Sequence, residues 1–406
     1  MSRKLTYVLL ILIFSCDDRE TDDNVYYFFQ PNAYYMEADG KSTLYLSLFR
    51  IDRYGGRTDI TQEAIFYHND QPIEGNTFTT ILVDEHRFKA TYGEWSSKEE
   101  IIISRIPKDY DLVSIPVIFH LLHNNELVGI GPNLSTETIT ALILTVNERF
   151  RNTYYDSRYA GSIKKPNHVD TKIQFRLAQY DPDGIPLAEP GIKRYSGIDA
   201  TAANWQENDT HCAYHQQIMW PIDQYINISV ANRAGVSFAS PPISSTNHPL
   251  CGTILVPEDL TWEEFIDTHF CVTASVYLTF GAITEDAYTL THELGHVLGL
   301  HHTFTSTVEC SYTLQPFGKY DCTEDTQFHK EILISESNGL QGYKECASDR
   351  WVIHDNYMGL INPYQYSNPF QGDHEVYLGF TSEQRDRMRE ILEYSPWIKD
   401  LKLSSK

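Results

Sequence analysis

Residues 291–304 read THELGHVLGLHHTF and hold four histidines, of which the last two are adjacent. In a helix, residues four apart share one face, so His292 and His296 present two imidazoles to one point. Glu293 lies one residue further round and can reach a water held at that point. This HExxH spacing supplies two zinc ligands and a general base. The stretch therefore predicts a zinc-binding helix with Glu293 as the catalytic residue.

A third ligand is expected just beyond the helix. Gly299 can adopt a left-handed conformation that ends the helix and turns the chain back towards the metal. His302, three residues later, completes the pattern HExxHxxGxxH. We expect His302 to bind one catalytic zinc and His301 to face solvent or packing. The alternative is a downstream glutamate such as Glu309 as the third ligand.

The quoted stretch resembles the zinc helix of the metzincins, and within them that of the pappalysin and cytophagalysin group. Five further segments carry the resemblance: IPVIFHLLHN (115–124), DPDGIPLAEPGIKR (181–194), QYINISV (224–230), NYM (356–358) and FTSEQRDRM (380–388). The resemblance implies a mixed α/β (α+β) catalytic domain, with zinc between an upper α/β part and a lower irregular part. It also implies that Met358, in the Met-turn, forms an apolar floor under the ligands.

Two segments depart from the family pattern. Family members usually continue the Met-turn with Asp and a Tyr that stabilises the transition state, whereas this chain has Gly359 and Leu360. Tyr357, Tyr364 or Tyr366 could substitute, or the assistance is missing. Residues 320–327, YDCTEDTQ, resemble an acidic stretch that helps to bind calcium, but Gln327 replaces its proline. The resulting calcium candidates are Asp321, Glu324 and Asp325, and an ordinary solvated loop is the alternative reading.

The N-terminus predicts export. Arg3 and Lys4 precede an apolar run at residues 5–14, which is too short for the roughly 20 residues of a membrane-spanning helix but fits a signal peptide. The run ends in Ile-Phe-Ser-Cys, which resembles the lipobox of bacterial lipoproteins and makes Cys16 the lipidated residue. We therefore expect a signal peptide at residues 1–15 and an acidic tether at 16–23. The expected location is the outer membrane, facing the cell surface.

The net charge argues against nucleic acid as a partner, and the cysteine count predicts disulfides. The 406 residues carry a formal net charge of -23, so a nucleic acid would be repelled, and none is expected as a partner. The acidity suits either a soluble exported protein or calcium binding. The six cysteines after Cys16 are an even number and predict disulfides in an exported chain. Within residues 211–215, HCAYH, a disulfide cysteine flanked by surface histidines is favoured over a second metal site.

The pattern along the chain suggests two domains. Residues 24–108 form short alternating runs, such as Leu44, Leu46 and Leu48, between turn candidates, and predict a small all-β immunoglobulin-like sandwich. Residues 109–406 alternate strands and helices, as a mixed-sheet catalytic domain does. Two helix starts are expected there, at the N-cap Ser135 and at the capping box of Thr381 and Gln384. Residues 274–281 read either as an edge strand or as a buried one.

These features predict a zinc endopeptidase that hydrolyses peptide bonds in extracellular proteins or peptides. Glu293 would take a proton from a water held at the zinc as that water attacks the peptide carbonyl. The rival hypothesis is a catalytically weak surface lipoprotein that uses the same scaffold and the sandwich for binding. It is motivated by Leu360, which stands where the family has its tyrosine.

Overall fold

The protein is described here from a computed structural model. The structure describes residues 25–52, 56–154, 165–198, 217–232, 237–239, 243–261, 275–279, 287–305, 321–330, 334–335, 341–346, 348, 350–352, 355–359, 378–396 and 398–403. The predicted signal peptide, tether and lipidated Cys16 lie outside these residues. Among the described residues, no helix is both long and apolar enough to span a membrane.

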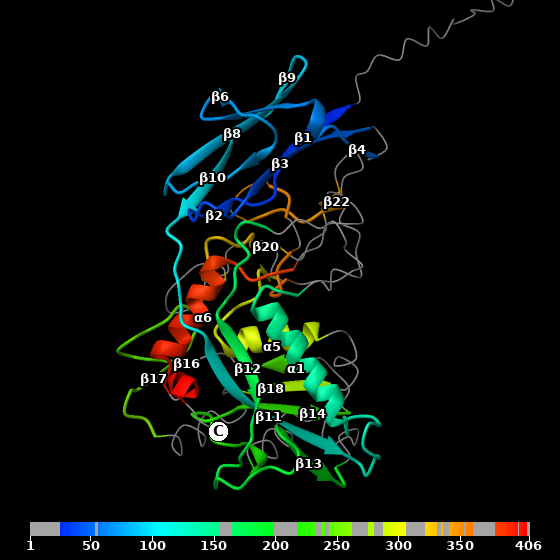
Figure 1. Ribbon diagram of the computed structural model, residues 1–406, viewed down its shortest axis with the longest axis vertical. Helices are drawn as coiled ribbons and strands as arrows, with labels where there is room; N and C mark the ends of the chain where they lie inside the picture. The colour runs from blue at the N-terminus through cyan, green and yellow to red at the C-terminus, as the bar shows by residue number, and fades with distance from the viewer. Residues whose placement is uncertain are drawn as a thin grey trace, which may run out of the picture.

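The N-terminal part consists of two β-sheets, drawn in blue and cyan in Figure 1. The first has the order β1-β3-β4, with β7 also paired to β3, and comprises β1 (Tyr26–Pro31), β3 (Leu44–Ile51), β4 (Arg57–Asp59) and β7 (Thr77–Phe78). The second has the order β2-β10-β8-β5-β6, with β9 on β8, and comprises β2 (Tyr35–Glu37), β5 (Ile65–His68), β6 (Gln71–Pro72), β8 (Glu85–Tyr92), β9 (Trp95–Ser96) and β10 (Glu100–Arg105). A short 3-10 helix, η1 (Thr61–Glu63), precedes β5.

Alternating side chains from both sheets build the core of this part. Leu44, Leu46 and Leu48 are fully buried, as their alternation predicts, and they pack with Phe66 and Phe88. In β10 the side chain of Ile102 is completely buried and that of Ser104 almost so. Two sheets around one apolar core agree with an all-β unit. Its immunoglobulin-like character and the proposed domain boundaries stay predictions.

The second part is built on one mixed sheet in the order β12-β11-β14-β18-β15, with β13 also paired to β11. Its strands are β11 (Val113–His123), β12 (Ile173–Leu177), β13 (Ile192–Ser196), β14 (Ile226–Ala231), β15 (Phe238–Ala239) and β18 (Ser275–Thr279). All neighbours run parallel except β15, which is antiparallel to β18. All six residues of β14 are buried, as expected for a central strand covered on both faces.

The helices join one face of this sheet in a single apolar core. They are α1 (Thr136–Phe150), α5 (Tyr288–Val297) and α6 (Ser382–Tyr394), and Figure 1 shows α1 and α5 beside the sheet and α6 next to them. The core contains Phe119 of β11, Val146 of α1, Leu294 of α5 and Ile391 of α6. On the opposite face Ile118 packs with a smaller aromatic cluster. The helix α5 is thus fixed between the sheet and two other helices.

Two of the predicted helix starts are confirmed. The Ser135 side chain accepts a hydrogen bond from the backbone N–H of Thr138 and caps α1. At α6, Thr381 and Gln384 form the reciprocal capping box. The apolar residues that recur at helical spacing in both helices are buried: Ile139, Leu142, Ile143, Val146, Phe150, Met388, Ile391 and Leu392.

The possibility that residues 274–281 form an edge strand is wrong. β18 lies between β14 and β15, so both of its edges are hydrogen-bonded. One edge of the described sheet is the two-residue strand β15. Such a short strand leaves no periodic signal in the sequence, because periodicity needs several residues.

The remaining described elements are short. They are the strand pairs β16 (Ile243–Ser245) with β17 (Ile254–Val256), β19 (Phe304–Thr305) with β20 (His329–Lys330) and β21 (Ile334–Ser335) with β22 (Gln341–Gly342), and the final 3-10 helix η4 (Ile398–Leu403). A disulfide joins Cys251 to Cys322, and Cys346 is also disulfide-bonded. The expected use of cysteines in disulfides is confirmed at these positions; Cys212, Cys271 and Cys310 lie outside the described residues.

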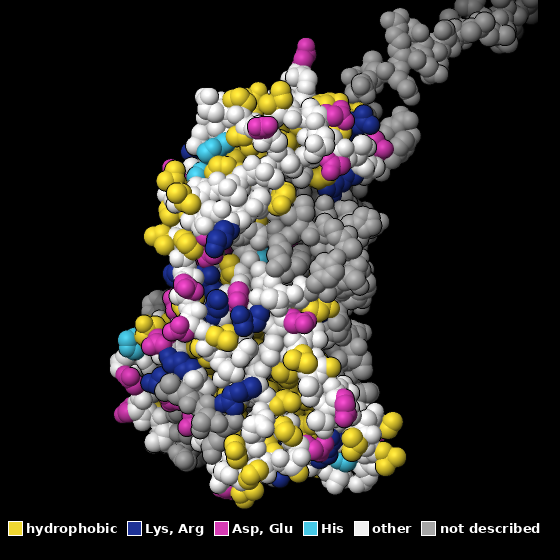
Figure 2. Space-filling model, in the orientation of Figure 1, with side chains coloured by type: hydrophobic (Ala, Val, Ile, Leu, Met, Phe, Trp, Pro, Cys, Tyr) yellow, Lys and Arg dark blue, Asp and Glu magenta, His cyan; other side chains and the backbone are white. Residues whose placement is uncertain are grey.

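Charged side chains hold the N-terminal part against α6. Arg385 of α6 pairs with Glu37 of β2 at 2.9 Å, and both side chains are almost completely buried. Arg105 of β10 reaches Glu383 and Glu324, the latter at 3.0 Å. Figure 2 shows basic and acidic side chains gathered side by side over this region and over α6. The two parts therefore meet through specific ion pairs.

Candidate metal centre

The helix α5 carries the first two predicted ligands. Leu290, Leu294 and Val297 are buried on its inner face, and this apolar spacing fixes which face the helix turns to the core. The helix begins at Tyr288 after Ala287, which has a positive φ of 57° and provides no side-chain cap. As a result His292 and His296 lie on the side of α5 that is not occupied by the core.

The end of α5 brings the chain back to these histidines, as Gly299 predicts. Gly299 has φ of 98°. Its N–H donates to the His296 carbonyl at 2.9 Å, and the Leu300 N–H donates to the Gly295 carbonyl at 2.9 Å. This pair of bonds is the Schellman arrangement of a helix C-terminus, which needs a left-handed residue at the glycine position. The turn directs His302 back towards α5.

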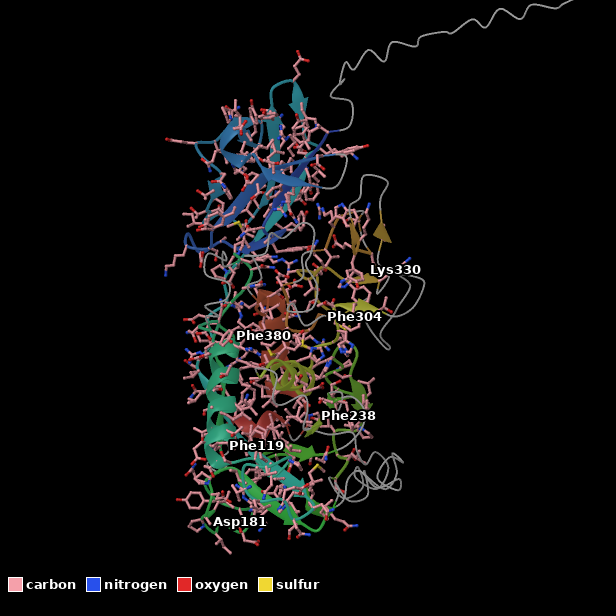
Figure 3. All side chains as sticks on the ribbon, turned by 90° about the vertical axis from the view of Figure 1, so that its right-hand side faces the viewer. Phe119, Asp181, Phe238, Phe304, Lys330 and Phe380 are labelled. Carbon is pink, nitrogen blue, oxygen red and sulfur yellow. A yellow bond between two sulfur atoms is a disulfide. The ribbon has the colours of Figure 1, made fainter. Side chains whose placement is uncertain are left out.

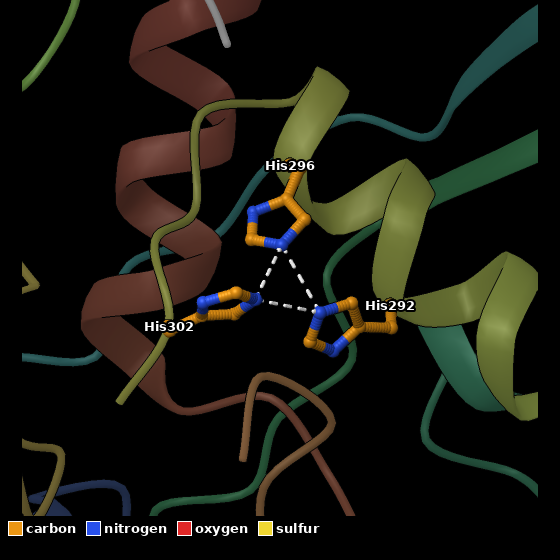
Figure 4. Close-up of side chains that lie close together, drawn as sticks. All are labelled: His292, His296 and His302. Atoms are coloured by element: carbon orange, nitrogen blue, oxygen red, sulfur yellow. Dashed lines mark hydrogen bonds between the residues drawn. The ribbon is translucent and has the colours of Figure 1, made fainter. Parts of the chain in front are cut away.

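Three imidazole nitrogens meet at one point, as Figure 4 shows. The Nε2 atoms of His292 and His296 are 3.0 Å apart, those of His296 and His302 are 3.0 Å apart, and those of His292 and His302 are 3.1 Å apart. Three ligands at the usual Zn–N distance in a tetrahedron would be about 3.3 Å apart. Among the described residues, these three are the one group of histidine, cysteine or acidic side chains close enough to hold a metal together.

Hydrogen bonds on the other side of two rings determine which nitrogen is a ligand. His292 Nδ1 lies 2.7 Å from the Tyr357 carbonyl, and His296 Nδ1 lies 2.8 Å from the Leu300 carbonyl. A carbonyl only accepts, so each Nδ1 carries the hydrogen and each Nε2 of these neutral rings presents a lone pair. Two lone pairs at 3.0 Å repel unless a cation lies between them. The residues present therefore fit a zinc ion held by three neutral imidazoles.

Burial keeps these rings neutral. It is the main cause that lowers the pKa of His292 to about 4 and the pKa of His296 well below its ordinary value, with neighbouring histidines adding to the effect. Burial also lowers the pKa of His302. Neutral imidazole is the form that binds a metal, so the three rings are ready to bind at neutral pH.

Glu293 lies on α5 next to the ligands and is buried, with 5% of its surface exposed. Burial raises the pKa of its carboxyl to about 8. A cation at the histidines would favour the charged form again, because opposite charges attract strongly where water is excluded. A carboxyl group whose pKa can be moved across neutrality suits a residue that takes up and returns a proton.

The Met-turn lies directly beneath the ligands. Met358 is completely buried, and a Cβ added at Gly295 of α5 would come within 2.6 Å of its Sδ. The Met358 carbonyl accepts the N–H of Thr303, the residue after His302, at 3.1 Å. Met358 is thus in the position that was predicted for an apolar floor. Gly295 is required there because any side chain would displace the methionine.

Tyr357 does not replace the tyrosine that the family usually has after its Met-turn. Its ring is 1% exposed and packs against Phe380 and Tyr288, and its carbonyl is the acceptor for His292. The Tyr288 hydroxyl lies 3.3 Å from that same carbonyl, a contact that the sequence did not suggest. Leu360, Tyr364 and Tyr366 lie outside the described residues.

Of the adjacent histidines, His301 is directed away from the other rings. Its Nε2 lies 3.2 Å from the Arg387 guanidinium of α6, and burial, followed by Arg387, lowers its pKa to about 3. His302 is flanked instead by Phe304, whose ring stacks on it at 4.5 Å and 15°. The expectation that His301 would enter packing is therefore confirmed. Glu309, the alternative third ligand, lies outside the described residues, as do His211, Cys212 and His215.

The three calcium candidates do not come together as a ligand group. Asp325 accepts hydrogen bonds from Thr381, Ser382 and the N–H of Glu383, and so caps the start of α6. Asp321 is bonded by Thr326, and Glu324 pairs with Arg105. Because these carboxylates satisfy groups of the protein, the structure offers no support for calcium.

A comparison with known protein families agrees with this geometry. Residues 244–393 match the Peptidase_M43 family, described as pregnancy-associated plasma protein-A. The chain carries a pappalysin-type metallopeptidase domain. This Peptidase_M43 domain covers α5, the Met-turn and nearly all of α6, and it makes the chain a metalloendopeptidase. No curated protein matches the chain.

Three solved structures are similar to this chain. A promirolysin mutant from Tannerella forsythia is 19% identical over 73% of this chain and 85% of that one, with a TM-score of 0.49. Mirolysin in complex with compound 9 is 20% identical over 73% and 97%, with a TM-score of 0.49. Mature mirolysin from Tannerella forsythia in complex with a cleaved peptide is 20% identical over the same shares, with a TM-score of 0.46.

Proposed function

We propose that the protein is a zinc-dependent endopeptidase in which His292, His296 and His302 bind the metal and Glu293 is the general base. One observation carries this proposal: the lone pairs of His292 and His296 face each other at 3.0 Å, with the His302 nitrogen equally close to both. When bound, zinc would polarise the scissile carbonyl and make an attacking water more acidic.

The chain's own groups then move the protons. Glu293 accepts a proton from the attacking water and returns it to the nitrogen of the leaving amine. Burial raises the pKa of its carboxyl, which favours the protonated form that donates in the second step. Its position beside the ligands makes it a carboxylate in the first step, because a nearby cation stabilises that form. The buried Met358 closes the site from below, and the half-buried Phe304 stacks on the ring of His302.

We propose that the substrate binds as an extended peptide along β15. This strand is one edge of the described sheet, and its antiparallel partner β18 leads towards α5. An exposed edge offers backbone donors and acceptors to any sequence. Phe238 of β15 and Phe304 beside His302 lie along the same side of the molecule in Figure 3. Backbone pairing predicts broad selection of unfolded or extended segments in proteins and peptides.

The proposed location rests on the sequence. We infer that Cys16 is lipidated, that residues 16–23 tether the chain to a bacterial outer membrane, and that residues 24–108 are an immunoglobulin-like spacer that holds the peptidase away from the membrane. A Cys16→Ala variant should appear in the soluble fraction without lipid, while a Cys346→Ala variant should stay with the membrane. Retention of the Cys16 variant would contradict the anchor.

The decisive experiment on activity replaces Glu293 with Gln. This change keeps the size of the side chain and removes its ability to accept a proton, so cleavage of a denatured protein should fall about 100-fold to 10,000-fold. Zinc content should stay near one per chain. The matched control is Glu94→Gln, since Glu94 is exposed in the turn between β8 and β9.

The rival function, a weak or inactive binding protein, predicts a different outcome. Wild type and Glu293→Gln would then degrade the substrate equally slowly, with or without bound zinc. Zinc binding without a difference in cleavage would reject the general base but keep the metal site. A wild-type protein that binds no zinc would reject the whole proposal.

A further inference from the structure

The Met-turn contacts the proposed metal site at three points. The Tyr357 carbonyl fixes the ring of His292, the Met358 side chain lies under Gly295, and the Met358 carbonyl holds Thr303 next to His302. A displacement of this turn would therefore move two ligands and the floor between them together. The position of the Met-turn must itself be fixed by something outside the ligand set.

Asn356, the first residue of the turn, is fixed by a pair of amide hydrogen bonds to α6. Its Nδ2 donates to Gln384 Oε1 at 2.8 Å, and Gln384 Nε2 donates to Asn356 Oδ1 at 3.0 Å. The backbone determines which atom is which. The Met358 N–H donates to Asn356 Oδ1 at 2.9 Å, and the Thr381 N–H donates to Gln384 Oε1 at 3.0 Å. The side-chain atoms that accept from these two backbone N–H groups must be oxygens, because an N–H only donates. The nitrogens of both amides therefore point to the partner side chain.

The partner of this pair is rigid. Gln384 is 1% exposed, and its helix is packed into the core through Met388 and Ile391. From the next turn of α6, Arg387 donates to the carbonyl of Gly299, the residue that ends the zinc helix. The same helix thus supports both the turn before His302 and the Met-turn. An amide pair on such a support fixes Asn356 relative to α6.

We infer that Gln384 is a positioning residue for the metal centre. Through Asn356 it sets the place of the Tyr357 carbonyl, and that carbonyl sets the tautomer and orientation of His292. This role differs from its part in the capping box, which only starts the helix. The inference rests on the proposed function, since it concerns the affinity of the same three histidines for zinc.

The Gln384→Glu variant separates the two roles. Glutamate at this position of a capping box accepts the same backbone N–H as glutamine, so the start of α6 stays capped. The second carboxylate oxygen, however, would face the Asn356 oxygen that the Met358 N–H holds in place. One of the two hydrogen bonds to Asn356 is then replaced by repulsion between two oxygens, which displaces the Met-turn, while the start of the helix is kept. The added negative charge would by itself favour a cation, so any loss of affinity reports position.

The test measures zinc affinity of the full chain by competition with a chelating dye, after zinc has been removed by dialysis. Loss of outer hydrogen bonds to metal ligands typically weakens binding about 10-fold to 100-fold, and we expect about a 10-fold loss. The unfolding temperature of the zinc-free variant should stay close to that of wild type. Gln71→Glu, the same change at an exposed position of β6, should bind zinc as wild type does.

Asn356→Asp tests the same bond from its other end. Its Oδ1 still accepts from Met358, but an oxygen replaces the nitrogen that donated to Gln384. A similar loss of zinc affinity is expected, and this variant keeps the test informative if Gln384→Glu does not fold. Wild-type affinity in both variants would overturn the inference while the zinc site stands. Absence of zinc binding by wild type would instead remove the proposed function on which the inference rests.

Discussion

Nδ1 of His296 donates a hydrogen bond to the carbonyl of Leu300 at 2.8 Å, across the turn that ends the zinc helix. The ligand is therefore oriented by the backbone that follows it, and that backbone has its shape because Gly299 is left-handed at φ of 98°. A single glycine links the helix end, the tautomer of the second ligand and the direction of the chain towards His302.

Gly299→Ala should therefore destabilise the protein and weaken zinc binding together. The alanine would have to keep a positive φ that is unfavourable for it, and its Cβ would overlap Ile391 of α6. We therefore expect a loss of about 2–4 kcal/mol in the free energy of unfolding. Urea unfolding of the zinc-free protein measures this change. Gly75→Ala is the control, because Gly75 has φ of 72° with nothing near its added Cβ. Gly75→Ala should lower the free energy of unfolding by only about 1 kcal/mol. Equal losses in the two variants would rule out a contribution from the overlap with Ile391.

His120 provides a test of pH dependence away from the metal. It is completely buried in β11, with Nε2 2.8 Å from the Asn227 side-chain oxygen, and burial lowers its pKa to about 4. The unfolded chain binds a proton below about 6.5, whereas the folded chain does so only below 4. Stability from this group is thus complete above pH 6.5 and decreases as the pH falls to about 4.

A fall in pH should consequently lower the free energy of unfolding of wild type more than that of His120→Gln. The glutamine amide can still donate to Asn227 but does not titrate. Between pH 7.5 and 5 the stability of wild type relative to the variant should fall by about 2 kcal/mol. The comparison is made between variants because Asp321, Asp325 and Glu293, whose pKa values are raised by burial, change stability in the opposite direction. A pH-independent difference would show that His120 is not held neutral.

The ion pair between Glu37 and Arg385 predicts how firmly the N-terminal sheets are attached. Both side chains are buried, at 11% and 4% exposure, and removal of one partner leaves a buried charge. Glu37→Gln should lower stability by about 2–4 kcal/mol, towards the smaller value because Arg385 keeps Asp386 at 2.8 Å. Glu99→Gln breaks an exposed pair with Arg87 of similar length, 3.0 Å, and should cost less than about 1 kcal/mol. Similar effects of the two changes, measured in urea, would mean that the attachment does not depend on this pair.

Local signals in the sequence predicted the convergence of the three histidines and the two helix starts. The arrangement of His292, His296, Gly299 and His302 depends only on helix geometry and one turn. It can therefore be predicted from the sequence without knowledge of the fold. The N-cap Ser135 and the capping box at Thr381 are equally local. Each of these predictions involves residues within about ten positions of one another.

What the sequence did not predict involves residues far apart in the chain. Glu37 and Arg385 are 348 positions apart, and Asn356 and Gln384 are 28 apart, so no periodicity relates them. Asp321 and Asp325 had the composition of a calcium site, but their carboxylates bond hydroxyl and N–H groups that α6 and the local loop bring to them. The edge strand β15 was missed because two residues carry no pattern.

The adjacent histidines allow the last test, which compares His301→Ala with His302→Ala. His302 contributes one of the three converging nitrogens, so its loss should reduce zinc affinity by several orders of magnitude and abolish the rise in unfolding temperature that zinc gives the wild type. His301 contacts Arg387 instead, so its loss should lower the stability of the zinc-free protein by about 1–2 kcal/mol and leave zinc bound. Calorimetry with and without zinc distinguishes the two effects. If His302→Ala kept its zinc, a ligand outside the described residues, such as Glu309, would have to complete the site.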